Sequence, residues 1–259
     1  MAKGYTRDRV AAMAEVVAVI VDDDGESLVL IGQEAHAHLT GELAASLPTH
    51  VPHRSAFVAA ARVHDNGWRE ADRAATVDSE GRPHTFTSAP DPIYEELWRR
   101  GIARAAAVDA LVGLLVGIHG ARFFKTRQSA GMRRLLAEER CRQDAVLVEL
   151  GLGGSWDALP AGVALASEWI AMLDALSLLL CGASLPERIS PRVAGEPYTV
   201  TRSHEVVTVE PWPYAGGACT FTVTARRIRR QPYASDEALR RALSQAEPYD
   251  LSVAVAPSR

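Results

Sequence analysis

The chain has 259 residues, of which 47% are hydrophobic and 23% are charged, and its formal net charge is -4. This is an ordinary globular composition, and the length favours one large domain or one domain with an appendage. The weak acidity argues against nucleic acid as the main partner. The three cysteines are far apart and form no CxxC pair, which argues against a disulfide framework and against a cysteine zinc site.

No segment resembles an export signal or a membrane span. Residues 1–14 carry charges without a following signal-type apolar core, and the apolar run 16–21 is too short to cross a bilayer. The longest apolar stretch, 170–181, is interrupted by Asp174 and Ser177. We therefore expect a cytoplasmic protein that contacts no membrane.

The first predicted element is a β-hairpin. Two β-rich apolar runs, 16–21 and 28–31, flank an Asp-Asp-Asp-Gly turn. Apolar residues at helical spacing then predict six helices, with a long Gly- and Pro-rich loop over residues 69–92. The predicted helices span residues 34–47, 55–65, 93–108, 110–123, 128–150 and 163–181.

The sequence pattern changes from helical spacing to strand-like alternation after a proline-containing linker around residues 186–197. Alternating residues predict strands over 198–201, 206–209 and 220–228, followed by a short helix over 235–245. The expected fold is mainly α: a helical bundle with an N-terminal β-hairpin and a small C-terminal antiparallel β-rich region. The three parts are a hairpin segment (1–32), a helical metal-binding core (33–190) and a β-rich region packed on that core (191–259).

Histidines on inward helix faces are the main chemical signal. His64 follows Phe57 by seven residues, which places it on the inward stripe of its helix, and Asp65 comes directly after it. His36 shares a face with the apolar residues 39, 43 and 47, whereas His38 lies on a more polar face beside Glu42. We expect His36 to point inward and His38 outward.

Two further polar residues lie in strongly apolar helices. His119 follows a run of leucines and isoleucine, and Asp174 lies in a helix that is apolar almost all round. A buried carboxylate must be paired, protonated or bound to metal. Hydrogen bonds to serine, arginine or the backbone would satisfy Asp174 alone, but one shared metal centre would satisfy all of these residues together.

The order of these residues resembles the HD-domain superfamily of metal-dependent phosphohydrolases. Its ligand pattern, H…HD…D, is matched in order and element type by His36, His64, Asp65 and Asp174, and His119 fits an accessory histidine. The resemblance implies an HD-like helical bundle and a divalent transition metal (Mn, Fe, Co or Zn), as one or two ions.

A closer resemblance is to an uncharacterised bacterial branch of HD-like proteins. It rests on residues 33–37 (QEAHA), 64–68 (HDNGW), Asp72, 81–86 (GRPHTF), 173–178 (LDALSL) and 211–214 (PWPY). His84 stands where that branch is expected to carry an aromatic residue. It is either a ligand of a second metal or a solvated loop residue.

Metal-activated water acting on a phosphoester is the reaction that the resemblance favours. Asp65 and His119 are the candidate catalytic residues, with His119 as substrate orienter, general acid or ligand of a second ion. Arg82 and Lys125 are candidates for phosphate contacts, although ordinary solvated charge explains both. Trp68 is a candidate pocket wall and Asp72 a candidate acceptor for a ligand histidine, while packing and capping explain them equally well.

Three functions stay open at this point. The first is a phosphohydrolase for a small phosphorylated metabolite or nucleotide. The second is a di-iron oxygenase, because some HD proteins with additional histidines activate oxygen, and His84 with His119 would supply those ligands. The third is a binding protein that retains metal without turnover. A small-molecule substrate is expected in the first two cases, and a homo-oligomer is possible in all three.

Overall fold

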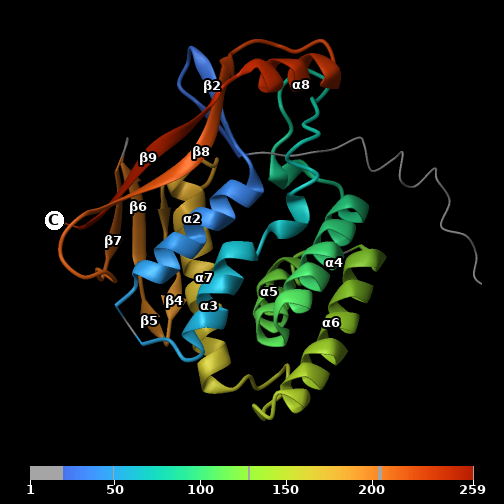
Figure 1. Cartoon of the computed structure of the whole chain (residues 1–259), viewed down its shortest axis with the longest axis vertical. Coiled ribbons are helices and arrows are strands. Elements are labelled where there is room, and N and C mark those ends of the chain that lie inside the picture. Colours follow the sequence, from blue (N-terminus) through green and yellow to red (C-terminus); the bar gives the residue numbers. More distant parts are fainter. Residues whose placement is uncertain (1–19, 49, 128, 204–205, 259) are drawn as a thin grey trace, which may run out of the picture.

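The computed structural model describes residues 20–48, 50–127, 129–203 and 206–258 (Figure 1). The expectation for residues 1–14 and the first part of the predicted strand 16–21 lie outside the described residues. Among the residues that the structure describes, 48% are helical and 22% lie in strands or bridges. Seven α-helices occur in the described ranges: α2 (Gln33–Ser46), α3 (Arg54–Val63), α4 (Asp91–Val108), α5 (Ala110–Phe124), α6 (Ala130–Glu149), α7 (Ala161–Leu180) and α8 (Asp236–Gln245).

Several of these helices begin at a capping side chain. Asp109 accepts hydrogen bonds from two backbone amides at the start of α5, Ser129 accepts one at the start of α6, and Ser235 accepts one at the start of α8. Such residues satisfy amides that have no partner inside the helix. All seven described helices begin within about two residues of the predicted positions, including α2, α3, α4 and α7, which have no side-chain cap.

Seven strands form one curled sheet in the order β1-β2-β8-β9-β7-β6-β3. The β7–β9 pair is parallel and the other pairs are antiparallel. A separate two-stranded ribbon joins β4 (Arg192–Val193) to β5 (Glu196–Pro197). The strands of the large sheet are β1 (Ile20–Asp23), β2 (Ser27–Ile31), β3 (Arg188–Ile189), β6 (Thr199–Ser203), β7 (Val206–Glu210), β8 (Cys219–Arg229) and β9 (Pro248–Pro257).

The prediction of a mainly α fold with a small C-terminal β-rich region is wrong, because the sheet is a major layer of the molecule. The N-terminal hairpin joins the C-terminal strands: β2 pairs with β8, with Leu28 opposite Ile228. Strand β9 was not predicted, although Leu251, Val253 and Val255 alternate along it, and it lies between β8 and β7. Pairing between segments about two hundred residues apart leaves no local periodicity that would reveal it.

The helices cover the sheet in successive layers (Figure 1). Helices α2 and α7 pack on each other and on the sheet, α2 against β8 and α7 against β6, β7 and β9. Helices α3 and α5 lie on the other side of this pair, and α4 and α6 lie outside α5. The ends of α3, α5 and α7 and the first half of α2 therefore meet deep in the molecule.

The long loop 69–92 is held by the C-terminal part of the chain. The backbone amide of Val77 donates to Asp236 at 2.8 Å, and the amide of Tyr233 donates to the carbonyl of Gly81 at 2.8 Å. Gly81 has a φ of +75°, and a Cβ there would lie 2.7 Å from the Tyr233 carbonyl oxygen, so a larger residue would strain the contact. The loop is therefore a fixed part of the structure.

Among the described helices, α7 alone is long and apolar enough to cross a membrane, with a mean hydropathy of 1.7. However, 72% of its apolar window is buried inside the protein. A core helix passes the same test of length and composition, so this is weak evidence for a membrane span.

Strand β9 provides a test of the sheet. We expect Val255→Ala to lower the free energy of unfolding by about 2 kcal/mol, because Val255 is fully buried. Ser252→Ala on the exposed face of the same strand should change it by less than about 0.5 kcal/mol. Urea unfolding followed by circular dichroism measures both, and equal small effects would show that β9 does not lie in the core of the sheet.

Candidate metal centre

Five polar side chains converge where α2, α5, α7 and the end of α3 meet. His36 comes from α2, His119 from α5 and Asp174 from α7, while His64 is the C-cap residue of α3 and Asp65 follows it. Each is buried, with an exposed fraction between 0% and 8%. The sequence places them inside because each occupies an inward position of an otherwise apolar helix face or helix end.

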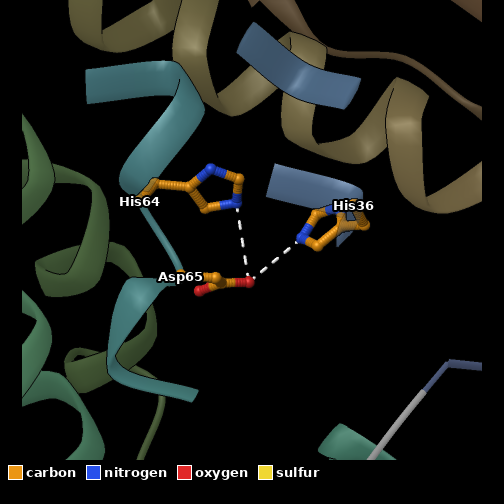
Figure 2. Close-up of side chains that lie close together, drawn as sticks. All are labelled: His36, His64 and Asp65. Carbon is orange, nitrogen blue, oxygen red and sulfur yellow. Dashed lines mark hydrogen bonds and ion pairs between the residues drawn. The ribbon is translucent and has the colours of Figure 1, made fainter. Parts of the chain in front are cut away.

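The three imidazoles direct their Nε2 atoms at the two carboxylates. Oδ2 of Asp65 lies 3.0 Å from Nε2 of His36 and 3.5 Å from Nε2 of His64, as Figure 2 shows. Oδ1 of Asp174 lies 3.3 Å from His64 Nε2 and 3.6 Å from His36 Nε2. Oδ2 of Asp174 lies 3.5 Å from His119 Nε2.

Hydrogen bonds on the far side of two rings fix their tautomers. His64 Nδ1 lies 2.8 Å from the carbonyl oxygen of Ala61, which accepts only, so Nδ1 carries the proton. His36 Nδ1 lies 2.8 Å from Ser177 Oγ, and that hydroxyl donates to the carbonyl of Asp174 at 2.8 Å. Ser177 therefore accepts from His36 Nδ1. In their neutral forms, both rings leave a lone pair on Nε2, facing the carboxylates.

A nitrogen lone pair repels an ionised carboxylate. The Nε2 lone pairs of the histidines can therefore face Asp65 and Asp174 only if a positive charge lies between them. Burial lowers the pKa of His64, but the charges of Asp65 and Asp174 outweigh it and raise that pKa to about 9. Burial likewise raises the pKa of Asp174, but contact with His64 outweighs it and holds this pKa well below its usual range. Burial lowers the pKa of His119 to about 4, so this ring is neutral near pH 7. Without a metal ion, the charge is supplied by a proton on His64.

The side chains also fit a metal ion. His64 Nε2 is buried and has no hydrogen bond of good geometry to any described residue, and the same is true of His119 Nδ1. Ligand atoms of His36, His64 and Asp65 lie within 4.8 Å of one another, as do those of His64, His119 and Asp174. Imidazole and carboxylate donors suit zinc, iron, manganese and cobalt. Because both groups share the single free nitrogen of His64, they favour one ion.

Aromatic rings surround the His119 side of the centre. The ring centroids of Trp98 and Phe123 lie 6.0 Å and 5.3 Å from that of His119, and these two rings stack on each other at 5.7 Å. Trp68 is buried and packs edge-on against Tyr94 at 5.9 Å. Sequence reasoning missed Trp98, Tyr94 and Phe123, since aromatic residues on inward helix faces are read first as core.

The helix phasing is confirmed for the first two histidines. His36 is fully buried and His38 is exposed, as their offsets from the apolar residues of α2 predicted. Thr40, one turn after His36, donates to Ser177 Oγ at 2.8 Å and was not predicted. The sequence did contain a feature that could have identified Thr40, because Thr40 and Ser177 are polar residues on the same apolar helix faces as the ligands.

Three predicted site residues lie away from the centre. His84 belongs to neither ligand group among the described residues, and its Nδ1 lies 3.0 Å from Ser88 Oγ. The exposed guanidinium of Arg82 forms ion pairs with two nearby carboxylates. The exposed Lys125 ammonium lies over the ring of Trp156, 5.0 Å from its centroid. The structure offers none of the three to a ligand at the centre.

Asp72 holds the helix that carries His36. Its carboxylate accepts hydrogen bonds from the backbone amides of Gln33 (3.0 Å) and Glu34 (2.9 Å), and it receives none from a histidine in the described ranges. Gly32, at the N-cap position, has no side chain to do this, and a Cβ there would lie 2.9 Å from Asp72 Oδ2. Burial raises the pKa of Asp72 to about 7, although the two amides act against this.

Taken together, a buried cluster of imidazoles and carboxylates between the helices of a mixed α/β fold defines a candidate metal-binding protein. Residues 19–230 match the family model described as "Protein of unknown function (DUF3891)", and the chain belongs to that family. The match includes the five residues of the centre and ends before α8 and β9. No curated protein and no solved structure matches the chain significantly. The resemblance to the HD superfamily stays a prediction.

The role of Asp72 can be separated from metal binding. We expect Asp72→Ala to lower the free energy of unfolding by about 1 kcal/mol, because α2 loses its cap. Asp72→Asn keeps an acceptor oxygen and should lower the free energy of unfolding by less than Asp72→Ala does. Urea unfolding and elemental analysis of the same samples provide the measurement. Loss of metal without loss of stability would show that Asp72 acts on the centre directly.

Proposed function

We propose that this chain is a metal-dependent hydrolase of the HD type that cleaves a phosphoester of a small metabolite or nucleotide. The observation that carries the proposal is the convergence of three buried Nε2 atoms on two carboxylates. In this proposal His36, His64, Asp65 and Asp174 hold one divalent transition-metal ion. The protein acts in the cytoplasm, without nucleic acid or membrane, as a monomer or homo-oligomer.

The residues in and around the centre have separate roles in the proposed reaction. A bound ion lowers the pKa of water and polarises a phosphoryl oxygen. Ala61 and Ser177 orient the His64 and His36 rings, so their lone pairs are set before an ion arrives. The carboxylates are the most exposed ligands, with 11% of the Asp65 side chain and 10% of the Asp174 side chain open to solvent. We assign Asp65 a second role as proton acceptor from water, because it faces both the centre and the solvent.

His119 completes the proposed site beside the ion. It is neutral near pH 7 and lies 3.5 Å from Asp174, next to the stacked rings of Trp98 and Phe123. A neutral imidazole in this position can orient the substrate by a hydrogen bond, whereas proton transfer to the leaving group would first require the ring to take up a proton. The ring pair then forms the apolar wall against which the leaving group packs.

Arg122 is a better candidate for anion binding than Arg82 or Lys125. It lies one turn after His119 on α5 and donates to Oγ and the carbonyl of Ser167, at 3.1 Å and 3.3 Å. No carboxylate of the described residues lies within ion-pair distance of Arg122. Burial lowers its pKa, and the more distant charges of Glu168 and Asp174 act against this. A guanidinium free of carboxylate partners is suited to a substrate phosphate.

The di-iron oxygenase and the non-catalytic binding protein remain alternatives that the experiment separates. The oxygenase needs ligands for a second ion, and His84 does not reach the centre. His119 is then the histidine left to serve that ion, with Asp174 shared between the two. This distribution of ligands favours the hydrolase with one ion.

The proposal is tested first by metal content. We expect His64→Ala and Asp174→Ala to lose the ion, because each removes a buried ligand and leaves the opposing charge uncompensated. His38→Ala, on the exposed face of α2, is the matched control and should keep the ion. Elemental analysis of protein purified without chelator gives the stoichiometry. Equal metal loss in all three variants would contradict the proposed ligand set.

The same proteins are then tested for turnover with a panel of phosphoesters. Hydrolysis that requires about one ion per chain and fails in His64→Ala supports the hydrolase. Arg122→Ala should raise KM about tenfold with a smaller effect on kcat, as expected for a lost charge-assisted hydrogen bond. About two irons per chain with oxygen uptake would instead establish the oxygenase, and metal without either activity the binding protein.

Metal affinity should depend on pH through His64. Below about pH 9 the metal-free ring holds a proton that an ion must displace from Nε2. We expect the apparent affinity to rise about tenfold per pH unit up to that value, with release of about one proton per ion. His119 adds no step above about pH 5, because its pKa lies at about 4. Competition titrations in buffers of different ionisation enthalpy measure both quantities.

The stability of the metal-free protein should fall as the pH rises, whereas the metal affinity should rise. The pKa of His64 is raised from 6.5 to about 9 in the folded protein. The stabilisation of the fold by protonated His64 is therefore complete below pH 6.5 and is lost as the pH rises to about 9. The melting temperature of chelated protein should therefore fall across this window, while loaded protein resists the change. A flat profile for both forms would contradict a proton shared with the carboxylates.

A further inference from the structure

A second candidate site lies apart from the metal centre. A cavity of about 580 Å³ opens between the β1–β2 hairpin, residues 78–88 of the long loop and residues 230–232 after β8. This is the end of the molecule near β2 and α8 in Figure 1. None of the five residues of the metal centre lines it. Its volume falls in the range of small-molecule sites.

The walls of this cavity are held in place by their own hydrogen bonds. Asp78 accepts from the backbone amides of Glu80 (2.8 Å) and Arg82 (2.9 Å), which closes the turn that Gly81 makes against Tyr233. On the other side, Arg230 Nε lies 2.8 Å from both carboxylate oxygens of Asp23. Ligand binding at such a site does not have to order the loop first.

The charges around the cavity compensate one another. Arg82 pairs with Asp78 at 2.9 Å and with Glu80 at 3.0 Å, and Arg230 pairs with Asp23. The lining thus holds two guanidinium groups and three carboxylates. A phosphate or dicarboxylate would meet three negative charges, two of them already sharing one arginine, so the lining disfavours a multiply charged anion.

His84 and Arg230 offer two hydrogen-bonding features to the cavity, an acceptor and a pair of donors. Ser88 Oγ donates to the carbonyl of Thr85 at 2.8 Å and therefore accepts from His84 Nδ1, 3.0 Å away. With the proton on Nδ1, the His84 ring presents Nε2 as an acceptor. Arg230 uses Nε for Asp23, and its terminal nitrogens bond no described residue, which leaves a planar edge for two acceptor atoms.

Four of the remaining lining residues are apolar, and Thr85 and Gln231 add polar side chains. Val21 and Leu28 come from the hairpin, and Pro83 and Pro232 contribute rings from the two other segments. Apolar walls with a few convergent polar groups are the usual design of a small-molecule site. A pair of acceptors on a planar ring is what an arginine edge recognises in guanine, through O6 and N7.

We propose that this cavity binds an uncharged heterocycle of the nucleoside class. The ring lies against Pro83, Pro232 and Leu28, an acceptor edge faces Arg230, and an N–H or O–H of the ligand donates to His84. The 81–86 motif then builds a ligand pocket: Gly81 permits the close turn, Arg82 closes it through Asp78, and residues 83–85 face the ligand. The site does not depend on the proposed hydrolase.

The test uses the imidazole carbon–proton NMR signals of the intact protein. His84→Gln identifies the His84 signal by its disappearance. Adenosine, guanosine and uridine are titrated, with their 5′-monophosphates and ribose as comparisons. At least one nucleoside should shift the His84 signal, and its monophosphate should bind about tenfold more weakly. His84→Gln should weaken nucleoside binding about tenfold, as measured by calorimetry, whereas His38→Gln, with an exposed imidazole on α2, should leave it unchanged.

Three outcomes would overturn the proposal, and each is read on the unmodified protein. The first is no shift of the His84 signal with any nucleoside at millimolar concentration. The second is binding that requires the phosphate group. The third is a nucleoside that shifts the His64 and His119 signals instead, which would place it at the metal centre. Chelation should leave binding at His84 unchanged, so failure of the metal proposal would not affect this result.

Discussion

The structure depends on one electrostatic requirement: two carboxylates are buried where apolar helices cross, and three imidazoles face them. An ionised carboxylate in such surroundings is stable only with a positive partner of good geometry. Asp65 and Asp174 meet between the lone pairs of His36 and His64, so the cluster is balanced only by a shared proton or a metal ion. This requirement, rather than any single ligand, is what makes the centre a candidate for chemistry.

The surrounding architecture brings the parts of that cluster together. Helices α2 and α7 lie directly on the sheet, which fixes His36 and Asp174 against a rigid layer. Asp72 then connects two ligand-bearing segments, because it follows the His64–Asp65 pair along the chain and caps the helix that carries His36. One side chain thus couples the position of the first ligand to that of the next two.

The sequence was informative where the signal was local. Helical spacing predicted the helices and separated His36 from His38, and apolar surroundings identified Asp174 and His119. It failed where the signal is long-range. Strand β9 alternates like its neighbours, yet its place between β8 and β7 depends on partners far along the chain. His84 and Arg82 carry suitable chemistry, but only the folded loop shows that they face a different cavity.

The order of segments along the chain has a consequence for folding. All ligands of the centre lie between residues 36 and 174, on α2, α5, α7 and the end of α3. The partner of β2 lies almost two hundred residues further on, in β8. Closing so long a loop costs more entropy than joining neighbouring helices, so the helical layer can assemble first. Until β8 arrives, the hydrogen-bonding edge of β2 is open, and an incomplete chain is most exposed to association with other strands there.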